Sequence, residues 1–217
     1  MTNDPEFFYD VQQGSEQWFE LRRGIPTASE FQTILANGKG RQSYLYKLAG
    51  EILTGKVSEA TFKPSLAMER GKTMEAEARD HYARTNFLDV QQVGFVRRKL
   101  KSGRYAGCSP DSLIDTAEGG AATERAVLEI KTMRPDLMIA AREAKKHTEI
   151  PSEHVAQVMG SLWITGYRRA DLLTFYEGMP FSFLVSAFRD EAYIKELEQA
   201  VEAFDADLDA LVRRMKK

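Results

Sequence analysis

The first third of the chain shows apolar residues at steps of three and four. They recur between residues 28 and 35 and, after the break NGKG, between residues 44 and 53. Such spacing predicts two short helices, each with one buried face. A third helical pattern begins at Ser65, the candidate cap, and continues to about Tyr82 with a densely charged opposite face.

From Val90 the spacing of apolar residues changes to two, which is typical of strands. The segments that show it are residues 90–100, 103–108, 112–116 and 126–132. Because they follow one another closely, they predict an antiparallel meander. The segment 117–125 (AEGGAATER) is the expected loop before the last strand.

Beyond Pro135 the pattern predicts helices to about Lys146 and over residues 153–165, then strands within residues 170–178 and 180–188. A long helix follows. Its apolar stripe, from Tyr193 to Met215, alternates steps of four and three, which favours packing against the body over a subunit contact. Without repeats or linkers, residues 1–217 are expected to form one domain.

Composition narrows the class of protein. The chain has 217 residues, 43% hydrophobic and 29% charged, which are ordinary globular values. Thirty basic and thirty-two acidic side chains give a net charge of −2, so any nucleic-acid site must be local.

Cysteine content and hydropathy bear on location. The one cysteine, Cys108, excludes an intramolecular disulfide, a four-cysteine zinc site and a cysteine-held iron–sulfur cluster. No stretch approaches the roughly 18 apolar residues of a membrane span, and the N-terminus has no signal-peptide pattern. We expect a cytoplasmic protein without a membrane partner.

The strand at residues 126–132 carries charges in an otherwise apolar run. A period of two puts Glu129 and Lys131 on one face and Leu128 and Ile130 on the other. If the strand at 112–116 pairs with it, Asp111 approaches Glu129. Two carboxylates and a backbone carbonyl are oxygen ligands of the kind that Mg²⁺ or Mn²⁺ prefers.

These oxygen ligands and the neighbouring lysine suit metal-assisted phosphodiester hydrolysis. A cation held by Asp111, Glu129 and the Ile130 carbonyl would polarise a phosphoryl oxygen and activate water, while Lys131 would position the water or neutralise charge. The alternative is a structural Glu–Lys pair on an exposed edge strand, with Asp111 as a plain turn residue. The motif alone does not decide between them.

Two further segments bear on this choice. In MERGKTMEAEARDHY, Glu75 could add a third carboxylate; the alternative is a solvated pair with Arg79. The segment QGSEQWFELRRGIPTAS supplies an aromatic ring, guanidinium groups and hydroxyls that suit a phosphate and a neighbouring base: Trp18, Arg22, Arg23, Thr27 and Ser29. The alternative there is an ordinary helix, followed by another that Thr27 or Ser29 caps.

A basic cluster of five cations lies within the eight residues from Arg97 to Arg104. It could line a DNA channel or form a solvated strand face and turn, and the sequence favours neither.

Four segments in this order resemble the YqaJ-like viral recombinases, the lambda exonuclease family of the PD-(D/E)xK nuclease superfamily. They are GSEQWFELRRGIPTAS, MERGKTMEAEARDHY, GCSPDSLID with VLEIKT, and HVAQVMGSLWITGY, which together span about residues 14–167. The resemblance implies an α/β fold with a restriction-endonuclease-like core, a central mixed sheet flanked by helices. It also implies Mg²⁺-dependent hydrolysis of double-stranded DNA from a 5′ end by a homotrimeric ring, encoded by a phage or prophage. The 3′ single strand left behind would pass to a single-strand annealing protein.

The resemblance also assigns roles by position. Asp111 and Glu129 match the family's metal carboxylates, Ile130 its carbonyl ligand, Lys131 its catalytic lysine and Glu75 its helix carboxylate near the metals. Arg22, Ser29 and Ser109 match the residues that hold the 5′-phosphate, and Gln157 lies on the helix that closes the site, where it could bind water or phosphate. Trp18 matches an apolar contact with the duplex end; the alternative for Trp18 is a core tryptophan. The chain departs from the superfamily's Gln-x-x-x-Tyr pattern in having Ser161 four residues after Gln157, with His154 three before it.

Two other functions fit the same residues. One is an endonuclease or single-strand-directed nuclease, because Asp/Glu-x-Lys chemistry does not fix where along DNA the cut falls. The other is a non-catalytic DNA-end binder, against which the presence of Glu75, Asp111, Glu129 and Lys131 together argues.

Overall fold

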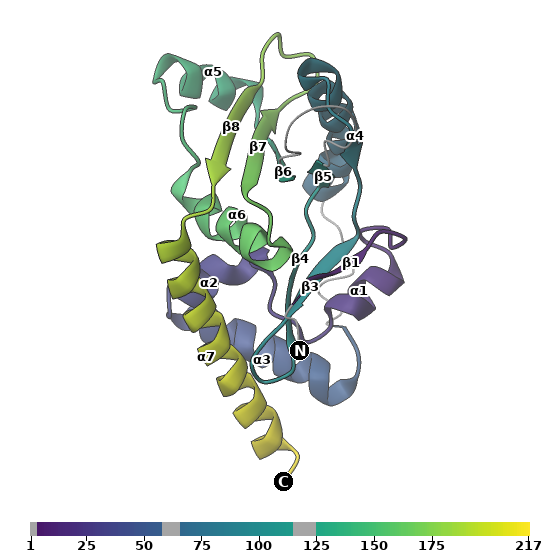
Figure 1. Cartoon of the computed structure of the whole chain (residues 1–217), viewed down its shortest axis with the longest axis vertical. Coiled ribbons are helices and arrows are strands. Elements are labelled where there is room, and N and C mark those ends of the chain that lie inside the picture. Colours follow the sequence, from purple (N-terminus) through teal and green to yellow (C-terminus); the bar gives the residue numbers. More distant parts are fainter. Residues whose placement is uncertain (1–3, 58–65, 115–124) are drawn as a thin grey trace.

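The computed structural model describes residues 4–57, 66–114 and 125–217, without the side chains of residues 66–73. These residues form an elongated molecule that contains two β-sheets (Figure 1). The candidate cap Ser65 and nearly all of the predicted loop 117–125 lie outside the described residues.

From residue 28 onward the helices and strands follow the predicted order, except that the expected strand at residues 90–100 is divided in two at residues 92–94. The strand at residues 6–8 is not predicted from the sequence. The helices are α1 (Glu16–Arg22), α2 (Phe31–Leu35), α3 (Lys39–Thr54), α4 (Leu66–Asn86), α5 (Pro135–Glu143), α6 (Ser152–Thr165) and α7 (Glu191–Met215), with a 3-10 turn at Ala28–Glu30. The strands are β1 (Glu6–Phe8), β2 (Val90–Gln91), β3 (Phe95–Lys99), β4 (Tyr105–Cys108), β5 (Ser112–Ile114), β6 (Ala126–Thr132), β7 (Arg169–Phe175) and β8 (Phe183–Phe188).

A five-stranded mixed sheet in the order β2-β5-β6-β7-β8 forms the centre of the fold. The β6–β7 pair is parallel and its other pairs are antiparallel. Helix α4 packs on one face of this sheet, against Leu128 and Ile130, and α6 packs on the face that carries Val127. The predicted central mixed sheet between helices is confirmed.

A hydrogen bond fastens α4 to this sheet. The hydroxyl of Tyr82, on the buried face of the helix, donates to the carboxylate of Asp171 on β7. Ser186 on β8 donates to the other oxygen of that carboxylate at 2.6 Å. The bond holds the helix in register with the strands below it.

The predicted meander is wrong at one point. Strands β3 and β4 pair with β1 in a separate three-stranded sheet, whereas β2 and β5 belong to the central sheet. The chain crosses between the sheets at Ser109-Pro110-Asp111. Pro110 has no N–H group to donate to a neighbouring strand, so the ladder breaks there.

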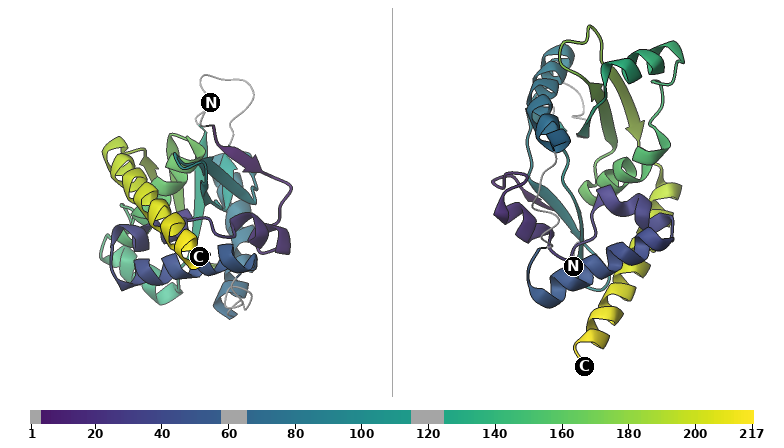
Figure 2. Two further views of the ribbon diagram at one scale, coloured as in Figure 1. Left: turned by 90° about the horizontal axis from the view of Figure 1, so that it is seen from below. Right: turned by 180° about the vertical axis from the view of Figure 1, so that it is seen from behind.

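The long C-terminal helix α7 runs beside α2, α3 and α6 (Figure 2). Its stripe is buried at Leu197, Val201, Phe204 and Leu208, so the prediction of core packing is confirmed, although Met215 at the end is exposed. No helix in the described parts of the chain is long and apolar enough to span a membrane.

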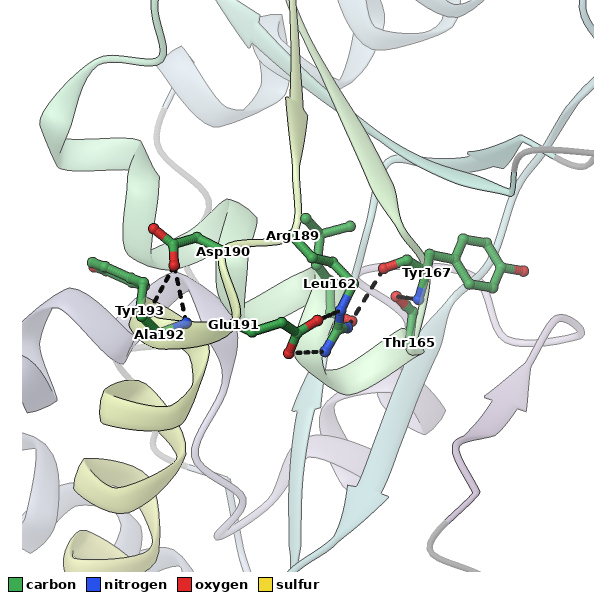
Figure 3. A network of polar contacts seen from close by, with 8 residues as sticks. All are labelled: Leu162, Thr165, Tyr167, Arg189, Asp190, Glu191, Ala192 and Tyr193. Atoms are coloured by element: carbon green, nitrogen blue, oxygen red, sulfur yellow. Dashed lines mark hydrogen bonds and ion pairs between the residues drawn. The ribbon is translucent and has the colours of Figure 1, made fainter.

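Two arginines cap the C-terminal end of α6. Arg189 donates to the carbonyl of Leu162 at 2.6 Å and Arg98 to that of Ile164 at 3.1 Å. The Arg189 guanidinium also pairs with Glu191 at the start of α7 (Figure 3). Positive charge is favourable at a helix C-terminus, so these contacts fix the helix that carries Gln157.

Candidate active site

Asp111, directly before β5, and Glu129, within the neighbouring strand β6, lie side by side. Ser112 pairs with Leu128, and the Asp111 carboxylate accepts a hydrogen bond of 2.6 Å from the Ile130 N–H. Glu129 is 2% exposed, and burial followed by the neighbouring Asp111 raises the pKa of Glu129 well above its usual range. Burial likewise raises the pKa of Asp111. The structure therefore concentrates two carboxyl groups in a region of low polarity.

Gln157 links these carboxylates to the lysine. From α6 its amide nitrogen donates to Glu129, while its amide oxygen accepts a hydrogen bond of 3.1 Å from the Lys131 ammonium. Lys131 and Glu129 point to the same face of β6, as the alternation predicts. The three side chains form a chain of contacts between the sheet and α6.

The donor set fits a divalent cation. Two carboxylates in contact and the Ile130 carbonyl offer the oxygen ligands that Mg²⁺ and Mn²⁺ prefer, and a cation would offset the repulsion that raises the pKa of Glu129. Among the described residues, no third His, Cys, Asp or Glu side chain joins these two carboxylates to form a metal-binding group of three or more. The structure therefore does not bring Glu75 together with Asp111 and Glu129; it lies on the wall of the cleft that Asp111 also borders.

Arg79, one turn along α4 from Glu75, contacts the backbone of Asp111. Its guanidinium donates to the Asp111 carbonyl at 3.0 Å, and the Ser112 hydroxyl donates to the same oxygen at 2.6 Å. The backbone of Asp111 is thus held from α4 as well as from the sheet.

A second polar cluster surrounds Ser109 and is called the Arg22 cluster; its members are Trp18, Arg22, Thr27, Ser29 and Ser109. The Arg22 guanidinium and the Trp18 indole N–H donate to the Ser109 hydroxyl oxygen at 2.8 and 2.9 Å. Arg22 also lies 4.1 Å above the Trp18 ring, as expected for residues four apart on α1. The hydroxyls of Thr27 and Ser29 are 3.3 Å apart beside it. A cation with several hydroxyls is suited to binding a phosphate.

The two clusters share one small chamber of about 160 Å³. Arg22, Ser29 and Ser109 line it together with Glu129 and Gln157. A cleft of about 1020 Å³ adjoins it, bordered by Trp18, Glu75, Arg79 and Asp111 among others. Of the predicted site residues, the chamber is lined by Trp18, Arg22, Ser29, Ser109, Glu129 and Gln157. Asp111 and Glu75 border the cleft instead. Asp111 is connected to the chamber residues by its side-chain contact with Glu129, and Lys131 by its hydrogen bond to Gln157.

Two residues at the site have no assigned role in the sequence patterns: Gln13 and Arg79. Gln13 donates to the carbonyls of Val93 and Pro110 at 3.0 and 2.8 Å. These partners are backbone atoms 80 and 97 positions away, so no local spacing could indicate them. The sequence indicates Arg79 only as the partner of Glu75. Thr27, expected either as a hydroxyl for a phosphate or as a helix cap, precedes the 3-10 turn without a side-chain capping bond and lines the chamber.

The basic cluster mostly makes internal contacts. Arg97 pairs with Glu6 at 2.7 Å, Arg98 caps α6, and Arg104 pairs with the buried Asp205 of α7 at 2.8 Å. Lys99 and Lys101 are exposed. His154 is half-buried on α6, and burial followed by the nearby Lys131 lowers its pKa.

The mixed sheet with a carboxylate pair and a lysine on adjoining strands defines a nuclease core of the PD-(D/E)xK class. The model of the YqaJ-like viral recombinase domain matches residues 17–168. The chain belongs to this family, as the ordered motifs predict.

Solved structures agree with this assignment. The alkaline exonuclease LHK-Exo from Laribacter hongkongensis, also solved in complex with dAMP, is 27% identical, with a TM-score of 0.77 over 93% of this chain and 96% of that one. A phage related exonuclease from Haemophilus somnus 129PT is 14% identical, with a TM-score of 0.58 over 91% and 99% of the two chains, and shows the shared fold. No curated protein matches the sequence. The protein is a nuclease of the recombination exonuclease family, which acts on DNA.

Proposed function

We propose that this protein is a metal-dependent 5′-to-3′ exonuclease that degrades double-stranded DNA from 5′-phosphorylated ends. It releases mononucleotides and leaves 3′ single strands for homologous recombination by annealing. The observation that carries this proposal is the shared chamber, in which the Arg22 cluster lies beside Glu129 and Gln157.

The residues in and around the chamber have different roles in this proposal. Asp111, Glu129 and the Ile130 carbonyl would hold Mg²⁺, or Mn²⁺ as the alternative, which supplies Lewis-acid activation of water and the phosphoryl oxygen. Lys131 places a positive charge where negative charge develops. Gln157 keeps the ammonium of Lys131 and the carboxylate of Glu129 at fixed positions. Glu75 borders the same cleft as Asp111, where its carboxylate would attract a second cation.

The Arg22 cluster explains the polarity. The Ser109 oxygen already accepts two N–H groups, so its own hydrogen is available to a phosphate oxygen. Arg22 and Ser29 would complete the contacts to a terminal 5′-phosphate, and Trp18 would contact the end of the duplex. Repeated capture of each new 5′-phosphate would then advance the enzyme one nucleotide at a time. The dAMP bound by LHK-Exo is a nucleoside monophosphate, the class of product expected here.

Family membership supports two further parts of the proposal. The active form is a homotrimeric ring around the duplex, and a single-strand annealing protein receives the 3′ strand in the cytoplasm of a phage-infected or lysogenic bacterium. Light scattering of the purified chain tests the ring: a mass of three protomers is expected, and a monomer at working concentration contradicts it.

The test of the activity uses linear duplexes that differ only in one 5′ end, phosphate or hydroxyl, beside a closed circular plasmid. Faster release of mononucleotides from the phosphorylated strand, with the circle left intact, is expected. Equal rates from both ends contradict the role of the Arg22 cluster. Internal fragments or a cut circle favour an endonuclease, and end binding without cleavage in Mg²⁺ or Mn²⁺ favours a binding module.

A further inference from the structure

The crossing between the two sheets is held together by side chains from the N-terminal segment. Strands β2 and β5 pair in the central sheet, and β3 and β4 pair in the other. The two connections that join them, residues 92–94 and 109–111, therefore run side by side where the ladder is interrupted. Their carbonyls need donors that the strands do not supply.

Gln13 and Trp18 supply those donors. Both N–H bonds of the Gln13 amide are used, one for Val93 and one for Pro110, at 3.0 and 2.8 Å. The Trp18 indole lies between the next pair, Gly94 and Ser109, at 2.9 Å from each oxygen. The two side chains thus form successive bridges across the crossing.

The backbone at Gly94 lies very close to the segment that precedes Gln13. A Cβ on Gly94 would lie 1.9 Å from the carbonyl oxygen of Val11, so only glycine lets the segment before Gln13 pack so closely. Val11 itself is buried. The Gln13 side chain is therefore held at one position, bordering both the large cleft and the small chamber.

The peptide that Gln13 holds joins the two halves of the site. Pro110 stands between Ser109, of the Arg22 cluster, and Asp111, of the carboxylate pair. The Asp111 carbonyl is fixed by Arg79 and Ser112, and its carboxylate by Ile130. The Pro110 carbonyl has Gln13 as its donor, so without Gln13 this peptide unit can rotate and carry the Asp111 Cα with it.

We propose that Gln13 is a positioning residue for the metal site: by holding the Pro110 carbonyl, it orients Asp111 to bind the divalent cation. The inference rests on the proposed function, because it takes Asp111 as a metal ligand. Loss of partners that orient a metal ligand commonly weakens metal binding by roughly 10- to 100-fold.

The test is calorimetric titration of the full-length chain with Mn²⁺ in the absence of DNA. Gln13→Met keeps the length of the side chain but removes both donors. Gln17→Met makes the same change at an exposed position on α1 and is the matched control. Asp111→Asn reports loss of the ligand itself. We expect Gln13→Met to bind Mn²⁺ at least tenfold more weakly than wild type, and Gln17→Met to bind as wild type does.

The outcomes separate the inference from the function on which it rests. If wild type binds Mn²⁺, Asp111→Asn does not, and Gln13→Met binds as wild type does, the positioning role is wrong and the metal site stands. If wild type binds no Mn²⁺, the metal site is wrong and the positioning role falls with it. A lower melting temperature of Gln13→Met with unchanged Mn²⁺ affinity shows a purely structural bridge and also overturns the inference. Should Gln13→Met fail to fold, Gln13→Asn, which is too short to bridge both carbonyls, is judged against Gln17→Asn by the same criteria.

Discussion

Glu129 is a buried carboxyl residue whose position costs the fold stability when the group is charged. A carboxyl group buried beside another carboxyl group is unfavourable when charged, and this is the reason that its pKa is raised. Gln157 and Lys131 compensate in part. Because the two carboxylates repel each other when both are charged, a cation bound between them would be stabilised by both.

The raised pKa values predict how metal binding depends on pH. Between about pH 4, the ordinary carboxyl range, and the raised pKa values of Asp111 and Glu129, the folded protein holds protons that the unfolded chain releases. The metal-free protein therefore loses stability as pH rises through this window. A cation competes with those protons, so the stabilisation by Mg²⁺ should grow with pH.

Melting temperatures with Mg²⁺ and with EDTA, from about pH 5 to about pH 8, measure this effect. The difference between the two should widen as pH rises in wild type and stay small in Glu129→Gln. A difference that is constant in wild type over the range would contradict the account.

Arg22→Ala should separate end recognition from metal binding. The Arg22 guanidinium contacts Ser109 rather than the carboxylate pair, so its loss should leave Mn²⁺ affinity within about twofold. Degradation of 5′-phosphorylated ends should fall by about tenfold or more, because a charge-assisted contact to phosphate is worth roughly 1.5–3 kcal/mol. Degradation rates on 5′-phosphorylated and 5′-hydroxyl ends measure end recognition, and Mn²⁺ titration measures metal binding. Arg23→Ala, which removes a partly exposed ion pair with Glu20, is the control. A variant that still prefers phosphorylated ends as strongly as wild type would contradict the role of Arg22.

At the scale of elements, the sequence predicts most helices and strands because each has one apolar face. Alternation on β6 predicts correctly that Glu129 and Lys131 share a face. The crossing at Pro110 is not predictable in the same way, because a period of two continues on both sides of it. Contacts that join distant segments, such as Gln13 to Pro110 or Gln157 to Glu129, leave no local pattern; the resemblance indicated Gln157, and nothing indicated Gln13.

Helix α7 provides the element-scale prediction. Phe204 is fully buried and stacks on Tyr44 of α3 with ring centroids 5.4 Å apart. Phe204→Ala should lower the free energy of unfolding by about 3–5 kcal/mol through lost burial and a residual cavity. Urea denaturation measures it, with Gln199→Ala on the exposed side of the same helix as the control. A loss below about 1 kcal/mol would show that α7 is not part of the core.

At the scale of the whole molecule, the site lies where the two sheets meet, and the β3–β4 turn lies at the other end of its hairpin, against α7. Arg104 and Ser102 of that turn contact Asp205, and the Lys101 backbone N–H donates to Glu202. From the sequence, the basic cluster could be interpreted either as the lining of a DNA channel or as a solvated face. Charge alone does not show what each arginine contacts. In the structure its three arginines hold the hairpin to its neighbours.

The double variant Lys99→Ala/Lys101→Ala tests where DNA runs. Both lysines are exposed, and neither borders the chamber or the adjoining cleft. We therefore expect the slope of log affinity for duplex DNA against log salt concentration to match that of wild type. A slope smaller by about 0.9 for each lost phosphate contact would place DNA on this face instead.

The most direct test of the account is digestion of a linear duplex with a 5′-phosphate on one strand and labels at both 3′ ends. Wild type with Mg²⁺, wild type with EDTA, and Lys131→Ala with Mg²⁺ are compared. We expect steady release of mononucleotides from the phosphorylated strand. EDTA should abolish it, and the substitution should reduce it at least 100-fold, since Lys131 would stabilise charge that develops in the transition state. Undiminished digestion by Lys131→Ala, or digestion that persists in EDTA, would contradict the assignment of the active site to Asp111, Glu129 and Lys131.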